Sequence, residues 1–225
     1  RHERQVDLPA FAVEEPEPVG DDAPEPERGR TYSNLGSASA ADLTSRLEFG
    51  DVDLSFSFLL PRGAHAKLWL MGRYGIALGD EVGALTPAHC GGLEPGASGA
   101  FPGKAPDFDA YRGAGEWHWV SARFQAARFD EQGRKTANAR LYRLLMDDVL
   151  LQDEIELPEA SAGAPLPGEA ARGPIVICSV NGEIAFRDLQ ARERTPVSDA
   201  QVLGWTPILD DLATWTQKGG ATWEL

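Results

Sequence analysis

The sequence predicts an all-β protein folded as a two-sheet antiparallel β-sandwich of the jelly-roll kind. Apolar and polar residues alternate with a period of two along most of the chain, and no segment shows the 3.6-residue apolar stripe of a long helix. Turns rich in Gly and Pro separate seven or eight such runs. Two antiparallel sheets packed face to face bury one side of every run, and a closed barrel is the alternative.

The first predicted strands lie between residues 51 and 80. In "DVDLSFSFLLP" the core face is Val52, Leu54, Phe56 and Phe58, and the face expected in water is Asp51, Asp53, Ser55 and Ser57. The run "AKLWLMGRYGIALGD" predicts two strands joined by a turn at Met71-Gly72. In the second of these strands Tyr74, Ile76 and Leu78 share the core face, so Gly75, Ala77 and Gly79 leave the other face almost bare.

The later strands follow a long loop, residues 82–115, that has no repeating period. In "GEWHWVSARF" Trp117 and Trp119 share one face. The pattern favours packing of both indoles in the core, and the alternative is an exposed indole that stacks on the apolar face of a sugar. Two hairpins are then predicted, the first at the tight turn Asp147-Asp148 and the second at Asn181-Gly182.

Composition narrows the classes of partner. The chain has 225 residues, of which 42% are hydrophobic, enough for one large all-β domain or two small ones. Its formal net charge of -14 predicts repulsion of nucleic acid and of anionic membranes over much of the surface. No window resembles the roughly 18 to 20 apolar residues of a membrane span, and the opening "RHERQVDL" lacks the apolar centre of a signal peptide.

Three regions follow from composition along the chain. Residues 1–30 include "VEEPEPVGDDAPEPERGR", which is rich in Pro and acids and predicts a tail or linker. Residues 31–195 hold the predicted sandwich. Residues 196–225 form a linker followed by a segment that carries three of the six tryptophans.

Cysteine and histidine usage gives weak signals for a disulfide or a metal. Cys90 and Cys178 are expected to be free thiols, with a single bridge as the alternative. The four histidines lack a metal-binding spacing such as His-x-x-x-His. A site assembled from distant strands, with His89 or His118 beside Asp80, stays open, and a structural calcium is favoured over a transition metal because oxygen ligands are plentiful.

Five segments, in order over about residues 44–194, resemble the 3-keto-disaccharide hydrolase domain family. They are "LEFGDVDLSFSFLLP", "GRYGIALGD", "GEWHWVSARFQAARFDEQGRK", "MDDVLLQDEIELP" and "GPIVICSVNGEIAFRDLQAR". The resemblance implies a concanavalin A-like jelly roll, similar in shape to laminarinase-type glycosidases, and cleavage of glycosides oxidised at C3. A C3 ketone acidifies the C2 proton, so a base can start an elimination. The resemblance also implies a divalent metal, calcium or manganese, in some members.

The polar positions of that family are mostly replaced in this sequence. Gly75 and Ala77 stand where the family carries Glu and Gln, and residues 178–181 stand where it carries Gln-Asp-His-Gly. Asp80 is the carboxylate retained at the strand end and is the candidate catalytic residue. The candidate substrate-binding residues are Arg73, Tyr74, His89, Trp117 and His118.

The C-terminal segment "GWTPILDDLATWTQKGGATWEL" resembles the segment that opens the family's domain, although here it comes last. It either begins a second copy of the domain or supplies strands that complete the first sandwich. We expect a tandem arrangement in which this segment packs on the first domain, because tryptophans left in water would expose much apolar surface.

These observations predict a secreted or periplasmic, carbohydrate-associated module. It is expected to be non-catalytic, to bind an oxidised glycoside or an oligosaccharide, and to act beside a second, catalytic domain of the same chain. The alternative is an active hydrolase or lyase of 3-keto-glycosides that uses Asp80, His118 or His89. A second alternative is a protein-interaction module that uses the acidic surface.

Overall fold

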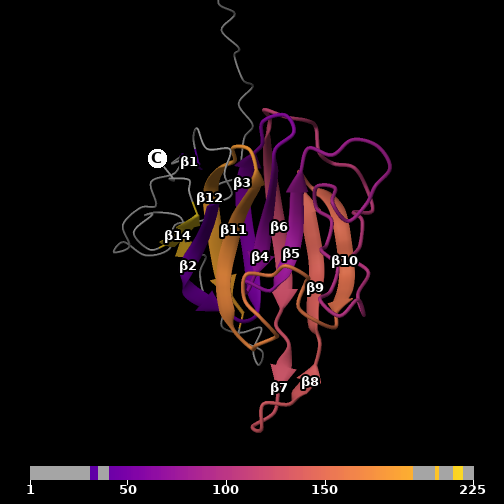
Figure 1. Ribbon diagram of the computed structural model, residues 1–225, viewed down its shortest axis with the longest axis vertical. Helices are drawn as coiled ribbons and strands as arrows, with labels where there is room; N and C mark the ends of the chain where they lie inside the picture. Colours follow the sequence, from indigo (N-terminus) through magenta and orange to yellow (C-terminus); the bar gives the residue numbers. More distant parts are fainter. Residues whose placement is uncertain (1–30, 35–40, 195–205, 208–214, 220–225) are drawn as a thin grey trace, which may run out of the picture.

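The computed structural model describes residues 31–34, 41–194, 206–207 and 215–219, and in this part of the chain it confirms the two-sheet antiparallel sandwich (Figure 1). Sheet A contains, in spatial order, β1 (Thr31–Ser33), β12 (Ala185–Glu193), β3 (Val52–Leu59), β6 (Trp117–Gln125), β9 (Ala139–Met146) and β10 (Val149–Leu157). Sheet B contains β14 (Trp215–Gly219), β2 (Ala41–Phe49), β11 (Gly173–Asn181), β4 (His65–Leu70) and β5 (Tyr74–Gly79). The described residues form no closed barrel and include no helix long and apolar enough to cross a membrane.

Three short strands, β13, β7 and β8, lie outside these two series. β13 (Thr206–Pro207) pairs with β12, and β14 pairs with β2, so the C-terminal segment adds a strand to each sheet. β7 (Arg128–Phe129) pairs with β8 (Lys135–Ala137) in a hairpin that extends beyond one end of the sandwich (Figure 1). The predicted tail, residues 1–30, lies outside the described residues, and the division into repeats stays a prediction.

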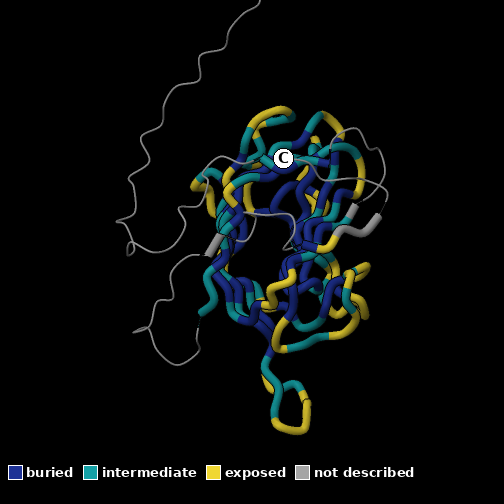
Figure 2. The backbone as a smooth tube through the Cα atoms, turned by 90° about the vertical axis from the view of Figure 1, so that its left-hand side faces the viewer, coloured by how far each residue is buried: buried dark blue, intermediate teal, exposed yellow. Residues whose placement is uncertain are grey.

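The core lies between the two sheets, where the buried segments of both face each other (Figure 2). Val52, Leu54, Phe56 and Phe58 are 0% exposed, as their alternation predicted. From sheet B, Tyr74 reaches across so that its ring centroid lies 5.2 Å from that of Phe124 on β6. Aromatic contact of this kind adds to the apolar area that holds the sheets together.

Two of the predicted hairpins are confirmed by their backbone angles. Met71 and Gly72 have φ values of 56° and 64° between β4 and β5, and Asp147 and Asp148 have φ values of 47° and 67° between β9 and β10. Positive φ at both central residues is the mark of a type I′ turn, whose twist matches that of paired strands.

The prediction of a hairpin at Asn181-Gly182 is wrong. β11 pairs with β2 and β4 in sheet B, whereas β12 pairs with β1 and β3 in sheet A, so this turn carries the chain from one sheet to the other. The Asn34 side chain holds the crossing, because its oxygen accepts a hydrogen bond from Ile184 N at 2.7 Å and its amide nitrogen donates to Gly182 O. An Asn-Gly pair permits a tight reversal, but it does not choose the partner of the next strand.

The expectation that the polar face of β3 is in water is only partly correct. Asp53 is 4% exposed and Ser57 is 8% exposed. The Asp53 carboxylate accepts hydrogen bonds from Arg123 on β6 at 2.8 Å and from Arg192 on β12 at 2.7 Å. The two guanidinium groups cover the carboxylate and join three neighbouring strands.

The face of β5 that carries Gly75 and Ala77 has no large side chains because other residues fill the space above it. Residues 91–94 pair with this edge of sheet B through hydrogen bonds from Ala77 N to Gly92 O (2.8 Å) and from Glu94 N to Gly75 O (3.0 Å). A Cβ atom on Gly75 would lie 2.8 Å from the Trp69 indole and 2.6 Å from Glu94 Cγ. The lack of side chains is therefore explained by packing, so it is not evidence for an emptied binding groove.

We expect Gly75→Ala to lower the free energy of unfolding by about 1 to 3 kcal/mol, because the added methyl group overpacks the contact with Trp69 and Glu94. Urea denaturation measures this difference. In a Trp69→Ala background, where part of the space is open, the same substitution should cost less. An equal cost in both backgrounds would contradict the packing explanation.

We also expect the stability provided by Asp53 to depend on pH. Burial alone would raise the pKa of its carboxyl group, but the hydrogen bonds from Arg123 and Arg192 lower it below the usual value. Such a group stabilises the fold above its unfolded pKa, about 4, and loses this contribution as the pH falls through its folded pKa.

Asp53→Asn should therefore lower the free energy of unfolding at pH 7 by about 2 kcal/mol. The difference from the wild-type chain should shrink as the pH falls below about 4. Urea unfolding at pH 7, 5 and 3 measures it, and the exposed Asp153→Asn variant on β10 is the control. A difference that stays constant from pH 7 to pH 3 would show that the charge of Asp53 is not what matters.

Candidate functional site

The predicted site residues lie at two opposite ends of the sandwich. Arg73 directly precedes β5 and Tyr74 begins it, whereas Asp80 directly follows it, so the length of the strand separates them. Neighbouring strands run antiparallel, which places the start of β6 and the turn between β9 and β10 at the Asp80 end. The structure therefore does not bring the six residues into one site.

Arg73 and Tyr74 hold together the end from which the β7–β8 hairpin extends. Arg73 Nη1 donates to Met71 O at 2.9 Å. Tyr74 is 2% exposed, and its hydroxyl donates to Glu169 Oε1 at 2.7 Å. Burial, and then the neighbouring Glu169 carboxylate, raise the pKa of Tyr74 far above its usual range, so the phenol stays protonated.

Asp80 and His89 are bonded to nearby backbone. Asp80 Oδ2 accepts a hydrogen bond from Gly63 N at 2.9 Å and so holds the turn between β3 and β4. His89 is 6% exposed, and its Nδ1 accepts from Thr86 N at 3.0 Å. Each contact fixes a loop at this end of the sandwich.

His118 is fully buried on the inner face of β6. Its Nδ1 lies 2.7 Å from Asp147 Oδ2, and because a carboxylate only accepts hydrogen bonds, Nδ1 carries the proton. The Tyr111 ring covers the imidazole at a centroid distance of 4.7 Å. A substrate cannot reach His118 without opening the core.

The residues present do not fit the divalent metal that the resemblance implies. Within the described ranges, no group of three or more His, Cys, Asp or Glu side chains lies close enough to hold an ion. The side chains of Asp80, His89 and His118 each form the hydrogen bond described above. Cys90 and Cys178 are both free thiols, as expected.

Trp117 and Trp119 lie on the outer face of sheet A, so the expectation that they pack in the core is wrong. Trp119 is 41% exposed. Trp117 is half-buried, because the guanidinium carbon of Arg187 on β12 sits 4.1 Å from its ring centroid. We call this surface the aromatic face and define it by Trp117, Trp119 and Arg187.

The backbone of the aromatic face is fixed from the neighbouring turn. Asp147 Oδ1 accepts a hydrogen bond from Trp119 N at 2.9 Å, and Asp147 Oδ2 also lies 3.2 Å from Arg112 Nη2. Arg112 in turn donates to Trp117 O. A fixed backbone leaves only the side-chain torsions of Trp119 to be ordered when a ligand binds.

The strands beside Trp119 supply small polar and apolar groups. Ser57 on β3 pairs directly with Trp119, and Ser121 lies two residues further along β6. On the other side Leu145 pairs with Leu150, which is 39% exposed. An exposed indole that shares its face of the sheet with the Ser121 hydroxyl group, the Arg187 guanidinium and aliphatic side chains can bind a ligand that is apolar on one face and polar at its rim.

Sequence reasoning missed Arg187 and Asp147 as parts of this surface. Asp147 was recognised only as a turn residue, and Arg187 carried no signal because its contact with Trp117 crosses from β12 to β6. The outward direction of the tryptophans could have been inferred from Arg123 and Gln125, which share their face of β6.

Comparison with known proteins supports the fold. A crystal structure of a candidate glycosyl hydrolase from Parabacteroides distasonis superposes with a TM-score of 0.57 at 18% sequence identity and covers 68% of each chain. Two further candidate glycosyl hydrolases from the same organism have TM-scores of 0.48, at 7% and 13% identity; they cover 68% and 73% of this chain and 74% and 87% of theirs. No family model and no curated protein matches the sequence.

Proposed function

We propose that this domain is a non-catalytic carbohydrate-binding module that uses the aromatic face of sheet A. The observation that carries the proposal is the exposed indole of Trp119 on a strand whose opposite face is core. A sugar ring has one apolar face of C–H groups and a rim of hydroxyl groups. An indole covers the former, while the partly exposed Ser121 and Arg187 on the same face of the sheet can bond the latter.

The groups that cleavage would need are already engaged within the fold, which also supports binding. A base and an acid must lie within hydrogen-bond reach of one reacting centre. Asp80 is bonded to Gly63, His89 is buried against Thr86, and His118 is enclosed in the core beside Asp147. We therefore place the proposed ligand on the aromatic face and assign it no reaction.

The fold is shared with a candidate glycosyl hydrolase, which supports a carbohydrate-related role. On this basis we propose that the domain is a degenerate relative of the 3-keto-disaccharide hydrolase family. We further propose that the protein is secreted or periplasmic and that the module acts beside a catalytic domain of the same chain. Its ligand would be an oligosaccharide or an oxidised glycoside.

Titration with neutral hexasaccharides tests the proposal. The probes are β-1,3-linked and β-1,4-linked glucose and β-1,4-linked xylose oligosaccharides, followed by isothermal calorimetry and tryptophan fluorescence. The wild-type chain should bind at least one probe, and Trp119→Ala should weaken that binding about tenfold, or about 1.4 kcal/mol.

Leu47→Ala is the matched control, because Leu47 is an apolar residue of sheet B that is 52% exposed. It should bind like the wild-type chain. If Trp119→Ala keeps full affinity, the aromatic face is not the binding surface. If the wild-type chain binds none of the three probes, the result counts against carbohydrate binding.

A further inference from the structure

A second feature of the outer face of sheet A lies at the root of the β7–β8 hairpin. It is a surface hollow of about 560 Å³, which we call the hairpin hollow. Its lining includes Gln125, Lys135, Asn138, Arg140, Tyr142 and Glu156. The volume falls within the range of small-molecule sites in proteins, about 300 to 1,000 Å³. None of the predicted site residues takes part in it.

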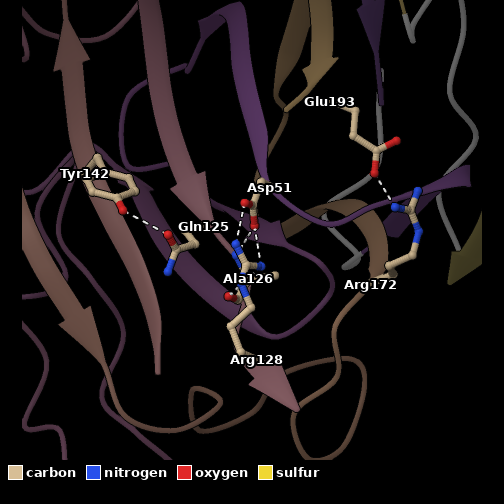
Figure 3. Close-up of polar contacts among 7 residues, drawn as sticks. All are labelled: Asp51, Gln125, Ala126, Arg128, Tyr142, Arg172 and Glu193. Carbon is tan, nitrogen blue, oxygen red and sulfur yellow. Dashed lines mark hydrogen bonds and ion pairs between the residues drawn. The ribbon is translucent and has the colours of Figure 1, made fainter. Parts of the chain in front are cut away.

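A β-bulge in β9 gives the hollow its aromatic wall. Arg123 pairs with Arg143 and Phe124 pairs with Leu141, so Tyr142 is the extra residue on β9. Its hydroxyl donates to Gln125 Oε1 at 2.8 Å (Figure 3). The bond uses the oxygen of the Gln125 amide, which leaves the two N–H donors of that amide for another partner.

The hairpin that forms the other wall is anchored at both of its strands. Asp51 accepts two hydrogen bonds from the Arg128 guanidinium, at 2.7 and 2.5 Å, and one from Ala126 N at 3.0 Å (Figure 3). On the second strand, Lys135 Nζ donates to Pro158 O and to Glu169. Walls held in this way are ordered before a ligand arrives, which lowers the entropy cost of binding.

The charges around the hollow largely cancel. Lys135 is paired with Glu169 at 2.6 Å, and Arg140 is paired with Glu154 at 3.1 Å. Asn138 donates to Glu156, which leaves oxygen acceptors on both of these residues. The hollow thus offers donors and acceptors in similar measure with little excess charge, as vicinal hydroxyl groups require and a phosphate does not.

We infer that the hairpin hollow binds one neutral sugar residue of the same glycan chain that stacks on Trp119. The inference rests on the proposed function, and it adds a second subsite and a minimum ligand length. Trp119 and Gln125 are six positions apart on β6, so the two subsites are separated by about 20 Å. A disaccharide therefore reaches only one of them, whereas a hexasaccharide can occupy both.

The test compares a disaccharide and a hexasaccharide of the best-bound linkage on two hollow variants. Thr136→Trp fills the hollow from the exposed hairpin, and Gln125→Ala removes its amide donors. Each should weaken hexasaccharide binding about tenfold and leave disaccharide binding unchanged. Glu131→Trp, on the exposed tip of the same hairpin, is the control and should change neither.

Nuclear magnetic resonance provides a readout at the hollow itself. The hexasaccharide should shift the side-chain amide signals of Gln125 and Asn138 in the wild-type chain, and the disaccharide should not. Unchanged hexasaccharide affinity in both hollow variants would overturn the inference, and it would leave the proposed binding at the aromatic face unaffected. If the hollow variants lose binding and Trp119→Ala binds fully, the aromatic face is not a binding surface. If inorganic phosphate shifts these signals and the hexasaccharide does not, the hollow is an anion site.

Discussion

Burial of the inner face of β6 decides where the aromatic face of this domain lies. Val120, Ala122 and Phe124 must face sheet B to close the core, and side chains on a strand alternate between its two faces. Trp119 is therefore forced outward, together with the polar residues that follow it on that face. A shift of one residue in the pairing of β6 with β3 would bury the tryptophan and expose the core, so the register and the aromatic face depend on the same constraint.

The two faces of the sandwich differ because their outer surfaces are filled in different ways. On sheet B, the Trp69 indole lies across Gly75, and residues 91–94 extend the sheet beyond β5. On sheet A, Asp53 is enclosed by Arg123 and Arg192, but Trp119 stays exposed. A tryptophan next to a glycine packs flat against its own sheet. Trp119, which pairs with Ser57 on β3, stays exposed.

Features that depend on local sequence could be predicted, and features that depend on distant partners could not. The alternation in β3 and β5 identified the core residues, and Asp147-Asp148 identified a hairpin, because a type I′ turn is set by its own two residues. Asn181-Gly182 was misassigned because the partner of β12 is chosen by the packing of Ile184 and the bonds of Asn34. The reason for Gly75 could not be predicted, because absence of a side chain marks either open space or a close neighbour, and only the structure distinguishes them.

Asp147 links the interior of the domain to the aromatic face. One of its carboxylate oxygens accepts from the buried His118 and lies beside Arg112, and the other accepts from the backbone of Trp119. His118 cannot turn away, because Tyr111 and Phe58 enclose its ring. The strand position that carries Trp119 is thus tied to a residue inside the core. The histidine that alternation placed beside two tryptophans has a structural role: it orients the carboxylate that keeps the aromatic face in place.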